Sequence, residues 1–217
     1  MAKRIDVYLV EKKLAESRQK AQALIAGGSV KVNSITVKKP SYQVEEGADV
    51  SVVEQLKYVG RGGYKLEGAL RAFDLNLKDL VCADIGASTG GFTDCMLQNG
   101  ARRVYAIDSG HGQLDPRLDA HPDVINLEGY NIRNFPSDTI SPVDFAAVDL
   151  SFISLTLVFE PICRLMKENA SAVFLIKPQF EAGREWVGKG IVQNPKVHQA
   201  VLEKTILAAK EAGFMPF

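Results

Sequence analysis

Short apolar segments alternate with segments of helical pattern from residue 80 onward. The strand-like segments are residues 80–87, 103–110, 123–131, 143–152 and 171–178, and the helix-like segments are 90–100, 114–120, 153–168 and 194–213. Near-continuous apolar strands that alternate with helices are typical of a mostly parallel sheet with right-handed crossovers and helices on both faces. The pattern therefore predicts an α/β fold with a Rossmann-like body.

Polar residues end the strand-like segments. Ligands of open parallel sheets bind beyond the carboxyl ends of the strands, at one edge of the sheet. The residues that we expect to meet at this edge are Gly86, Asp108, Asn131, Asp149 and Lys177.

The charge of the chain is unevenly spread, although 26 Lys and Arg residues balance 26 Asp and Glu residues. Residues 1–39 hold nine basic and three acidic residues, a net charge of +6, so the other 178 residues carry −6. A basic face collects phosphates by releasing counterions, whatever the total charge. The asymmetry is consistent with a small nucleic-acid-binding module, and equally with a solvated, lysine-rich surface.

The first 53 residues predict a small α+β domain. Its expected elements are helices over 5–14 and 17–28, a hairpin over 29–39 around Asn33 and Ser34, and a further strand over 42–53 with a turn at Gly47. This order, with the segment "SRQKAQALIAGGSVKVN", resembles the S-four type (alpha-L) RNA-binding domain over about residues 3–55. By that resemblance the phosphate contacts are Arg4, Arg18, Lys20 and Lys31, which read backbone and shape rather than base edges.

Three glycines within four residues interrupt the pattern after this domain, at Gly60, Gly62 and Gly63. We interpret the segment as a hinge, and its basic residue Arg61 as a further RNA contact. The expected division is therefore an RNA-binding domain at 1–58, a linker at 59–64 and a second domain at 65–217.

The segment "DIGASTGGFTDC" has the form of a nucleotide-binding loop with one departure. Dinucleotide loops need glycine at the second position so that the backbone can approach a pyrophosphate, and here that position holds Ala87. The carboxylate of Asp84 also disfavours a phosphate. S-adenosylmethionine carries no phosphate but has a sulfonium, an ammonium and a ribose diol that Asp108 is placed to bind. The loop predicts a methyltransferase, the alternative being a Rossmann-like protein whose glycines only make a tight turn.

Three charged residues predict the reaction type. Asp149 and Lys177 each emerge from an apolar strand, and Lys65 precedes the first helix of the second domain. A lysine beside another cation and an apolar wall loses its proton more readily, so it is suited to act as a general base that an aspartate orients. This set resembles the catalytic group of the FtsJ-like ribose 2′-O-methyltransferases.

Nearly the whole chain resembles the TlyA-type haemolysin family of ribosomal RNA methyltransferases. The motifs that carry this resemblance are "GGYKLEGAL", "DIGASTGGFTDC", "VDLSFISL" and "LIKPQFE", together with the N-terminal domain. The resemblance implies methyl transfer from S-adenosylmethionine to a ribose 2′-hydroxyl of cytidine in ribosomal RNA. In this reaction Lys177 would accept or polarise the hydroxyl proton, Asp149 would position it, and Lys65 would hold the nucleotide.

The resemblance also implies a cofactor pocket that needs no metal. Its expected residues are Asp84, Gly86, Ala87, Ser88, Thr89, Gly90, Gly91, Asp108, Asn131 and Asp149. The expected partner is ribosomal RNA or a ribosomal subunit, and the sequence does not determine the oligomeric state.

The last residues, "EAGFMPF", fall where a sixth strand would begin. The fourth member of the family's catalytic group is a glutamate on a late strand, so we expect a truncated chain that lacks it. Glu181 follows the fifth strand and is not its equivalent.

Other classes of function find less support in the sequence. A cytolysin needs a membrane-active segment, and the apolar runs are too short to span a bilayer. The Arg117–Asp119 triplet occurs in pseudouridine synthases, but here it reads as a helix surface. Three widely separated cysteines and the charged N-terminus indicate a reducing cytoplasm. A noncatalytic RNA-binding protein remains the strongest alternative.

Overall fold

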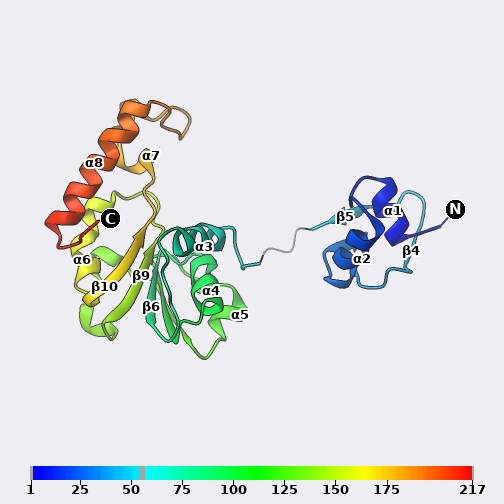
Figure 1. Ribbon diagram of the computed structural model, residues 1–217, viewed down its shortest axis with the longest axis horizontal. Coiled ribbons are helices and arrows are strands. Elements are labelled where there is room, and N and C mark those ends of the chain that lie inside the picture. Colours follow the sequence, from blue (N-terminus) through cyan, green and yellow to red (C-terminus); the bar gives the residue numbers. More distant parts are fainter. Residues whose placement is uncertain (1, 54–56, 217) are drawn as a thin grey trace. The chain divides into compact units, whose positions relative to one another are not determined.

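The computed structural model describes residues 2–53 and 57–216 (Figure 1). The chain divides into two compact units, Met1–Lys57 and Tyr58–Phe217. Residues 54–56, which the sequence assigns to the end of the RNA-binding domain, lie outside the described residues.

Within its described residues, the first unit contains two helices and five short strands. The helices are α1 (Ile5–Glu11) and α2 (Arg18–Ala26), and the strands are β1 (Lys3–Arg4), β2 (Val30–Val32), β3 (Ile35–Val37), β4 (Gln43–Val44) and β5 (Val50–Val52). Strand β2 pairs with β3 and β5 in an antiparallel sheet, while β1 pairs with β4. Ser17 caps α2 by accepting a hydrogen bond from the Lys20 amide.

The predicted hairpin is confirmed, but the predicted strand over 42–53 is two strands. Asn33 and Ser34 both adopt positive φ, which a tight two-residue hairpin turn requires. Gly47 lies between β4 and β5 with φ +85° and reverses the chain. The two strands consequently join different sheets.

The second unit is built on a five-stranded parallel sheet of order β10-β9-β6-β7-β8. The strands are β6 (Val81–Ile85), β7 (Arg103–Asp108), β8 (Val124–Glu128), β9 (Val143–Val148) and β10 (Met166–Phe174). Every pairing in this sheet is parallel, which confirms the predicted Rossmann-like body. The order reverses at β6, so the ligand site of such a sheet is expected beyond β6.

Helices cover both faces of this sheet. They are α3 (Gly62–Ala72), α4 (Gly91–Gln98), α5 (Pro116–Asp119), α6 (Phe159–Cys163), α7 (Pro178–Glu181) and α8 (Pro195–Glu211), with 3₁₀ turns η1 (Ile132–Asn134), η2 (Ser137–Thr139), η3 (Leu155–Leu157) and η4 (Arg184–Trp186). Buried side chains of α3 and α4 pack in one cluster with β6 and β7, and those of α6 and α8 pack in another on the opposite face (Figure 1).

The predicted helix over 153–168 is wrong in its length. Only η3 and α6 form there, and β10 begins at Met166, which pairs with Val143. Pro161 has no amide hydrogen and is tolerated only in a first helical turn, so the helix cannot extend back through residue 157. At the other end, Met166 pairs in the sheet, so the residues from there onward are not available to the predicted helix.

The glycine-rich segment also differs from the predicted linker at 59–64. Gly62 and Gly63 lie in the first turn of α3. A β-carbon at Gly63 would lie 2.3 Å from the ring of Tyr58, and one at Gly91 would lie 3.3 Å from the α-carbon of Gly62. These glycines therefore allow close packing between α3, α4 and the preceding residues.

Candidate cofactor and catalytic site

Asp84 lies near the carboxyl end of β6 and is fully buried. Its Oδ2 accepts hydrogen bonds from the amide and the hydroxyl of Thr93, at 2.7 and 2.6 Å, which fastens the first turn of α4 to the strand. Its Oδ1 has no hydrogen-bond partner among the described residues. Burial raises the pKa of Asp84 to about 7, although the hydrogen bonds from Thr93 oppose the shift. Asp84 therefore anchors α4 to β6, and its Oδ1 remains able to accept a hydrogen bond.

The loop after β6 follows a path that glycine makes possible. Gly86 has φ +89°, and a β-carbon there would lie 2.7 Å from the carbonyl oxygen of Asp149. Gly90 has φ +93°, and a β-carbon there would lie 2.3 Å from Leu118. The methyl group of Ala87 is buried in the cluster that contains Leu118. Ala87 thus serves packing. The second glycine of a G-x-G-x-x-G loop falls at Ser88, which has φ +47°, and not at Ala87 as the sequence interpretation has it.

Asp108, at the end of β7, joins two loops. Its Oδ2 accepts from the Ser88 amide at 2.8 Å and its Oδ1 accepts from the Gly110 amide at 2.7 Å. Asn131 caps η1 by accepting from the Arg133 amide at 3.0 Å. Both side chains thus have a local role and also line a cavity.

Two adjoining cavities lie beyond the carboxyl ends of the strands. The larger has a volume of about 990 Å³, and the predicted residues that line it are Gly86, Ser88, Asp108, Asn131 and Asp149. The smaller, of about 250 Å³, is lined by Arg61, Lys65, Asp84, Gly86, Ala87, Ser88, Thr89, Gly91, Asp149 and Lys177. Of the predicted site residues in this unit, Gly90 alone lines neither cavity.

Asp149 lies between the two predicted lysines. Its Oδ2 is 3.1 Å from the Nζ of Lys65, which comes from α3, and its Oδ1 is 2.5 Å from the Nζ of Lys177, which follows β10. Lys177 also donates to the hydroxyl of Ser151 at 2.9 Å. The side chains of Asp149 and Lys177 are mostly buried, whereas that of Lys65 is half exposed. The structure therefore gathers the predicted trio on one carboxylate that borders both cavities.

Sequence reasoning missed three residues around this trio. Ser151 binds Lys177, and the rings of Phe152 and Phe180 lie 5.1 Å apart on the wall of the larger cavity. Phe152 is 90% exposed and has φ +64°, a strained backbone for a bulky residue. The available signal for Phe152 was an aromatic residue three positions after the strand-end acid Asp149 in "VDLSF".

Glu181 binds residues other than the predicted trio. It is buried and accepts hydrogen bonds from the Ser154 hydroxyl and the Leu155 amide, at 2.5 and 2.7 Å. It therefore holds η3. The Arg117–Asp119 triplet lies on α5, where Arg117 pairs with Asp115 on the surface, as the sequence interpretation had it.

In the first unit, two of the predicted RNA contacts lie together. Arg4 and Arg18 both bind the buried carboxylate of Asp6, a partner that the sequence did not reveal. Lys20 is exposed on the first turn of α2, and Lys31 is half-buried at the centre of β2. No helix in the described part of the chain is long and apolar enough to cross a membrane.

The site fits S-adenosylmethionine better than a phosphate-bearing cofactor. The carboxylates of Asp84, Asp108 and Asp149 stand at the ends of three adjacent strands, where they favour positive groups and hydroxyls. The unpartnered Oδ1 of Asp84 adds a buried hydrogen-bond acceptor among the residues that line the smaller cavity. Fold and site together define the class of S-adenosylmethionine-dependent methyltransferases.

Comparison with known proteins specifies the family. Residues 58–216 match the profile of the FtsJ-like methyltransferases and residues 3–50 match the S4 domain. The chain therefore belongs to the FtsJ-like methyltransferase family, carries an S4 domain at its N-terminus, and is an enzyme that uses S-adenosylmethionine.

Relatives match nearly the full chain. The 16S/23S rRNA (cytidine-2′-O)-methyltransferase TlyA of Mycobacterium tuberculosis is 39% identical over 97% of this chain and 80% of that protein. Hemolysin A of Brachyspira hyodysenteriae is 37% identical over 97% of this chain and 89% of that protein. A solved structure from Streptococcus thermophilus, described as that of a hemolysin, has a TM-score of 0.73 and 40% identity over 98% of this chain and 79% of its own.

Proposed function

We propose that this enzyme transfers a methyl group to the 2′-hydroxyl of a cytidine ribose in ribosomal RNA. The observation that carries the proposal is the position of Asp149, which binds Lys65 and Lys177 where the two cavities adjoin. The names of the relatives from Mycobacterium tuberculosis and Campylobacter jejuni, both rRNA (cytidine-2′-O)-methyltransferases, support the substrate.

Each residue of the trio has a proposed role. Lys177, held by Asp149 and Ser151, accepts or polarises the proton of the ribose hydroxyl. As a neutral amine Lys177 takes up this proton and becomes an ammonium group, which Asp149 orients and stabilises. Lys65, which is more exposed, holds the phosphate of the target nucleotide. The bound cofactor supplies an electrophilic methyl group on its sulfonium. Much of the rate comes from alignment of the hydroxyl oxygen with that methyl group.

The cofactor contacts are proposed from the same geometry. Asp108 binds the ribose diol, while Asp84 and the loop from Gly86 to Gly91 surround the amino-acid part. Asn131 contributes from the far side of the larger cavity. Arg4, Arg18, Lys20, Lys31 and Arg61 are the proposed phosphate contacts.

The test is methyl transfer to isolated ribosomal subunits. Tritiated S-adenosylmethionine labels the RNA, and nuclease digestion followed by chromatography should yield 2′-O-methylcytidine. Lys177→Ala should lower turnover by about 100-fold or more, the scale of a lost general base, with RNA affinity unchanged. Lys196→Ala, which removes an exposed lysine at the start of α8, is the matched control and should keep wild-type turnover. Label on a base, or full turnover by Lys177→Ala, would contradict the proposal.

A further inference from the structure

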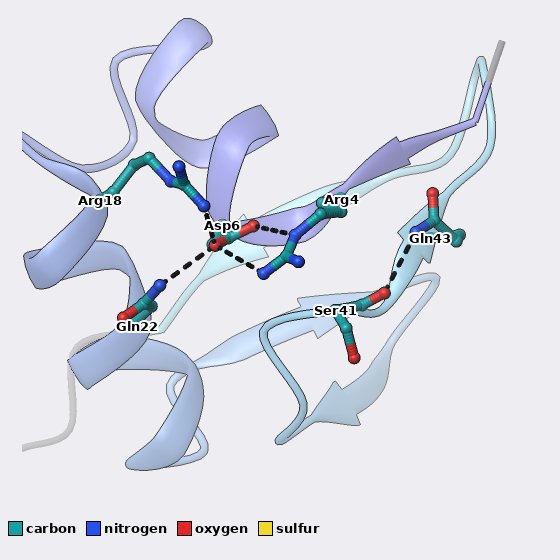
Figure 2. Close-up of polar contacts among 6 residues, drawn as sticks. All are labelled: Arg4, Asp6, Arg18, Gln22, Ser41 and Gln43. Carbon is teal, nitrogen blue, oxygen red and sulfur yellow. Dashed lines mark hydrogen bonds and ion pairs between the residues drawn. The ribbon is translucent and has the colours of Figure 1, made fainter.

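A fully buried carboxylate lies beneath two surface arginines in the first unit. Asp6 occupies the first turn of α1 and is 0% exposed. Arg4 precedes α1 on β1, while Arg18 and Gln22 lie on α2, and all three side chains point at this carboxylate (Figure 2). A buried acid is rare unless it is paired, so its partners need an explanation.

The contacts to Asp6 fix the two guanidinium groups. Arg4 donates from Nε to Oδ1 at 3.0 Å and from Nη2 to Oδ2 at 3.1 Å, the two-bonded fork that arginine makes with carboxylates. Arg18 donates from Nη2 to Oδ2 at 3.0 Å, and Gln22 donates to the same oxygen at 3.2 Å. These partners, Arg4 foremost, hold the pKa of Asp6 far below its ordinary range despite burial. Asp6 is thus ionised throughout the neutral pH range.

Most of the N–H groups of both arginines remain available. Each guanidinium has five, of which Arg4 uses two and Arg18 uses one on Asp6. Within residues 2–53 and 57–216, no other acceptor binds them. The side chains of Arg4 and Arg18 are 46% and 60% exposed. Two cations on one carboxylate also leave a net positive charge at this point on the surface.

We propose that Asp6 is a positioning residue for RNA binding, which holds Arg4 and Arg18 as one preorganised phosphate-binding pair. The inference rests on the RNA-binding part of the proposed function. An unrestrained arginine loses rotamer freedom when it binds a phosphate, and that loss weakens binding. Because Asp6 restricts Arg4 and Arg18 when the protein folds, the two side chains lose less conformational entropy when they bind RNA.

The sign of one substitution separates this role from simple electrostatics. A carboxylate repels RNA, so charge alone predicts that Asp6→Asn tightens binding. Asparagine has nearly the same shape but only one acceptor oxygen, so it cannot receive the fork from Arg4. If Asp6 positions the arginines, Asp6→Asn should therefore bind RNA more weakly, although it is one charge more positive.

The experiment measures the affinity of the full-length protein for a structured ribosomal RNA fragment at several salt concentrations. Asp6→Asn should weaken binding about tenfold, which corresponds to about 1.4 kcal/mol. Glu16→Gln removes one exposed negative charge from the same unit and should leave affinity equal or slightly tighter. In an Arg18→Gln background, Asp6→Asn should weaken RNA binding by a smaller factor, because Asp6 then positions only Arg4.

Arg18→Lys covers the case in which Asp6→Asn does not fold, as judged by circular dichroism. It keeps the charge but loses the planar group, so it should also weaken RNA binding, with affinity for S-adenosylhomocysteine unchanged. Asp6→Asn or Arg18→Lys that folds and binds RNA as tightly as wild type would overturn the inference while leaving the proposed function intact. Absence of RNA binding by the wild type would instead overturn the RNA-binding part of the proposed function.

Discussion

Single carboxylates in this protein take roles that their environments determine. Asp84 is buried with two hydrogen bonds, and its pKa is raised to about 7, while Asp6 is as deeply buried but paired with two arginines, and its pKa is lowered. Burial disfavours the charged form, and at Asp6 the hydrogen bonds and positive charge of its partners reverse that preference. The same residue type is thus an anchor that changes charge near neutral pH in one unit and an ionised anchor in the other.

The raised pKa of Asp84 predicts a dependence of stability on pH. Its ordinary value is 3.8, so between about pH 4 and 7 the unfolded chain has lost this proton while the folded chain still holds it. The stability from the neutral carboxyl is therefore present at low pH and is lost as pH rises through 7. Asp84→Asn stays neutral, so its free energy of unfolding relative to wild type should increase from pH 5 to 8, by at most about 3 kcal/mol.

Urea unfolding at each pH, followed by Trp186 fluorescence, measures this difference. Trp186 is the single tryptophan and lies in the second unit, so the signal reports on that unit. Asp138→Asn changes an exposed aspartate of the same unit and is the matched control, whose difference from wild type should vary less with pH than that of the buried Asp84. A constant difference for Asp84→Asn as well would show that Asp84 is ionised in the folded protein at every pH tested.

Substitution of Asp108 is expected to lower cofactor affinity. Its carboxylate already organises the amides of Ser88 and Gly110, so its removal affects both the proposed diol contact and the loops around it. Asp108→Ala should weaken S-adenosylhomocysteine binding by about 1.5 to 3 kcal/mol in calorimetry, the scale of hydrogen bonds to a charged group. Asp138→Ala should bind as wild type does, and tighter binding of NAD than of S-adenosylhomocysteine would refute the cofactor assignment to this pocket.

Polar residues at strand ends were largely predictable, but their surroundings were not. Asp108, Asn131, Asp149 and Lys177 meet at one edge because the carboxyl ends of parallel strands lie together. The burial of Asp84 and the pairing of Asp6 depend on side chains distant in sequence, which no local pattern reveals.

At the scale of elements, periodicity predicted the sheet better than the short helices. Apolar runs identify the five strands because the three central ones, β6, β7 and β9, are largely buried, although the edge strands β8 and β10 are partly exposed. The segment after β9 is largely apolar, so its pattern could not separate η3 and α6 from the start of β10. The glycines at 60–63 were interpreted from conformational freedom, whereas the structure requires Gly63 because a side chain there would collide with Tyr58.

The packing of α3 predicts opposite effects from two glycine substitutions in one helix. A methyl group at Gly63 would lie 2.3 Å from the Tyr58 ring, so Gly63→Ala should lower the free energy of unfolding by about 1 to 3 kcal/mol. A methyl group at Gly68 meets nothing within 4 Å, so Gly68→Ala should raise it by up to about 1 kcal/mol. Urea unfolding monitored at Trp186 tests both. Equal effects would show that α3 packs less closely than the structure has it.

At the scale of the whole molecule, the two units divide charge and chemistry between them. The basic excess lies in residues 1–39, and both cavities lie in the second unit. The uneven charge could be predicted from the sequence, because counting charged residues requires no knowledge of contacts. The arginine pair on Asp6 required the structure, because β1, α1 and α2 bring its members together.

This division predicts that RNA affinity and cofactor affinity respond to different substitutions. Lys20→Glu reverses an exposed charge on α2, so it should weaken binding of a ribosomal RNA fragment and make the slope of log affinity against log salt shallower by about one. Affinity for S-adenosylhomocysteine should stay at the wild-type value, because the cavities belong to the other unit. Lys196→Glu makes the same charge change on α8 of the second unit and is the matched control. If Lys20→Glu and Lys196→Glu weaken RNA binding equally, the basic segment has no special role, and the affinity arises from the charge of the whole protein.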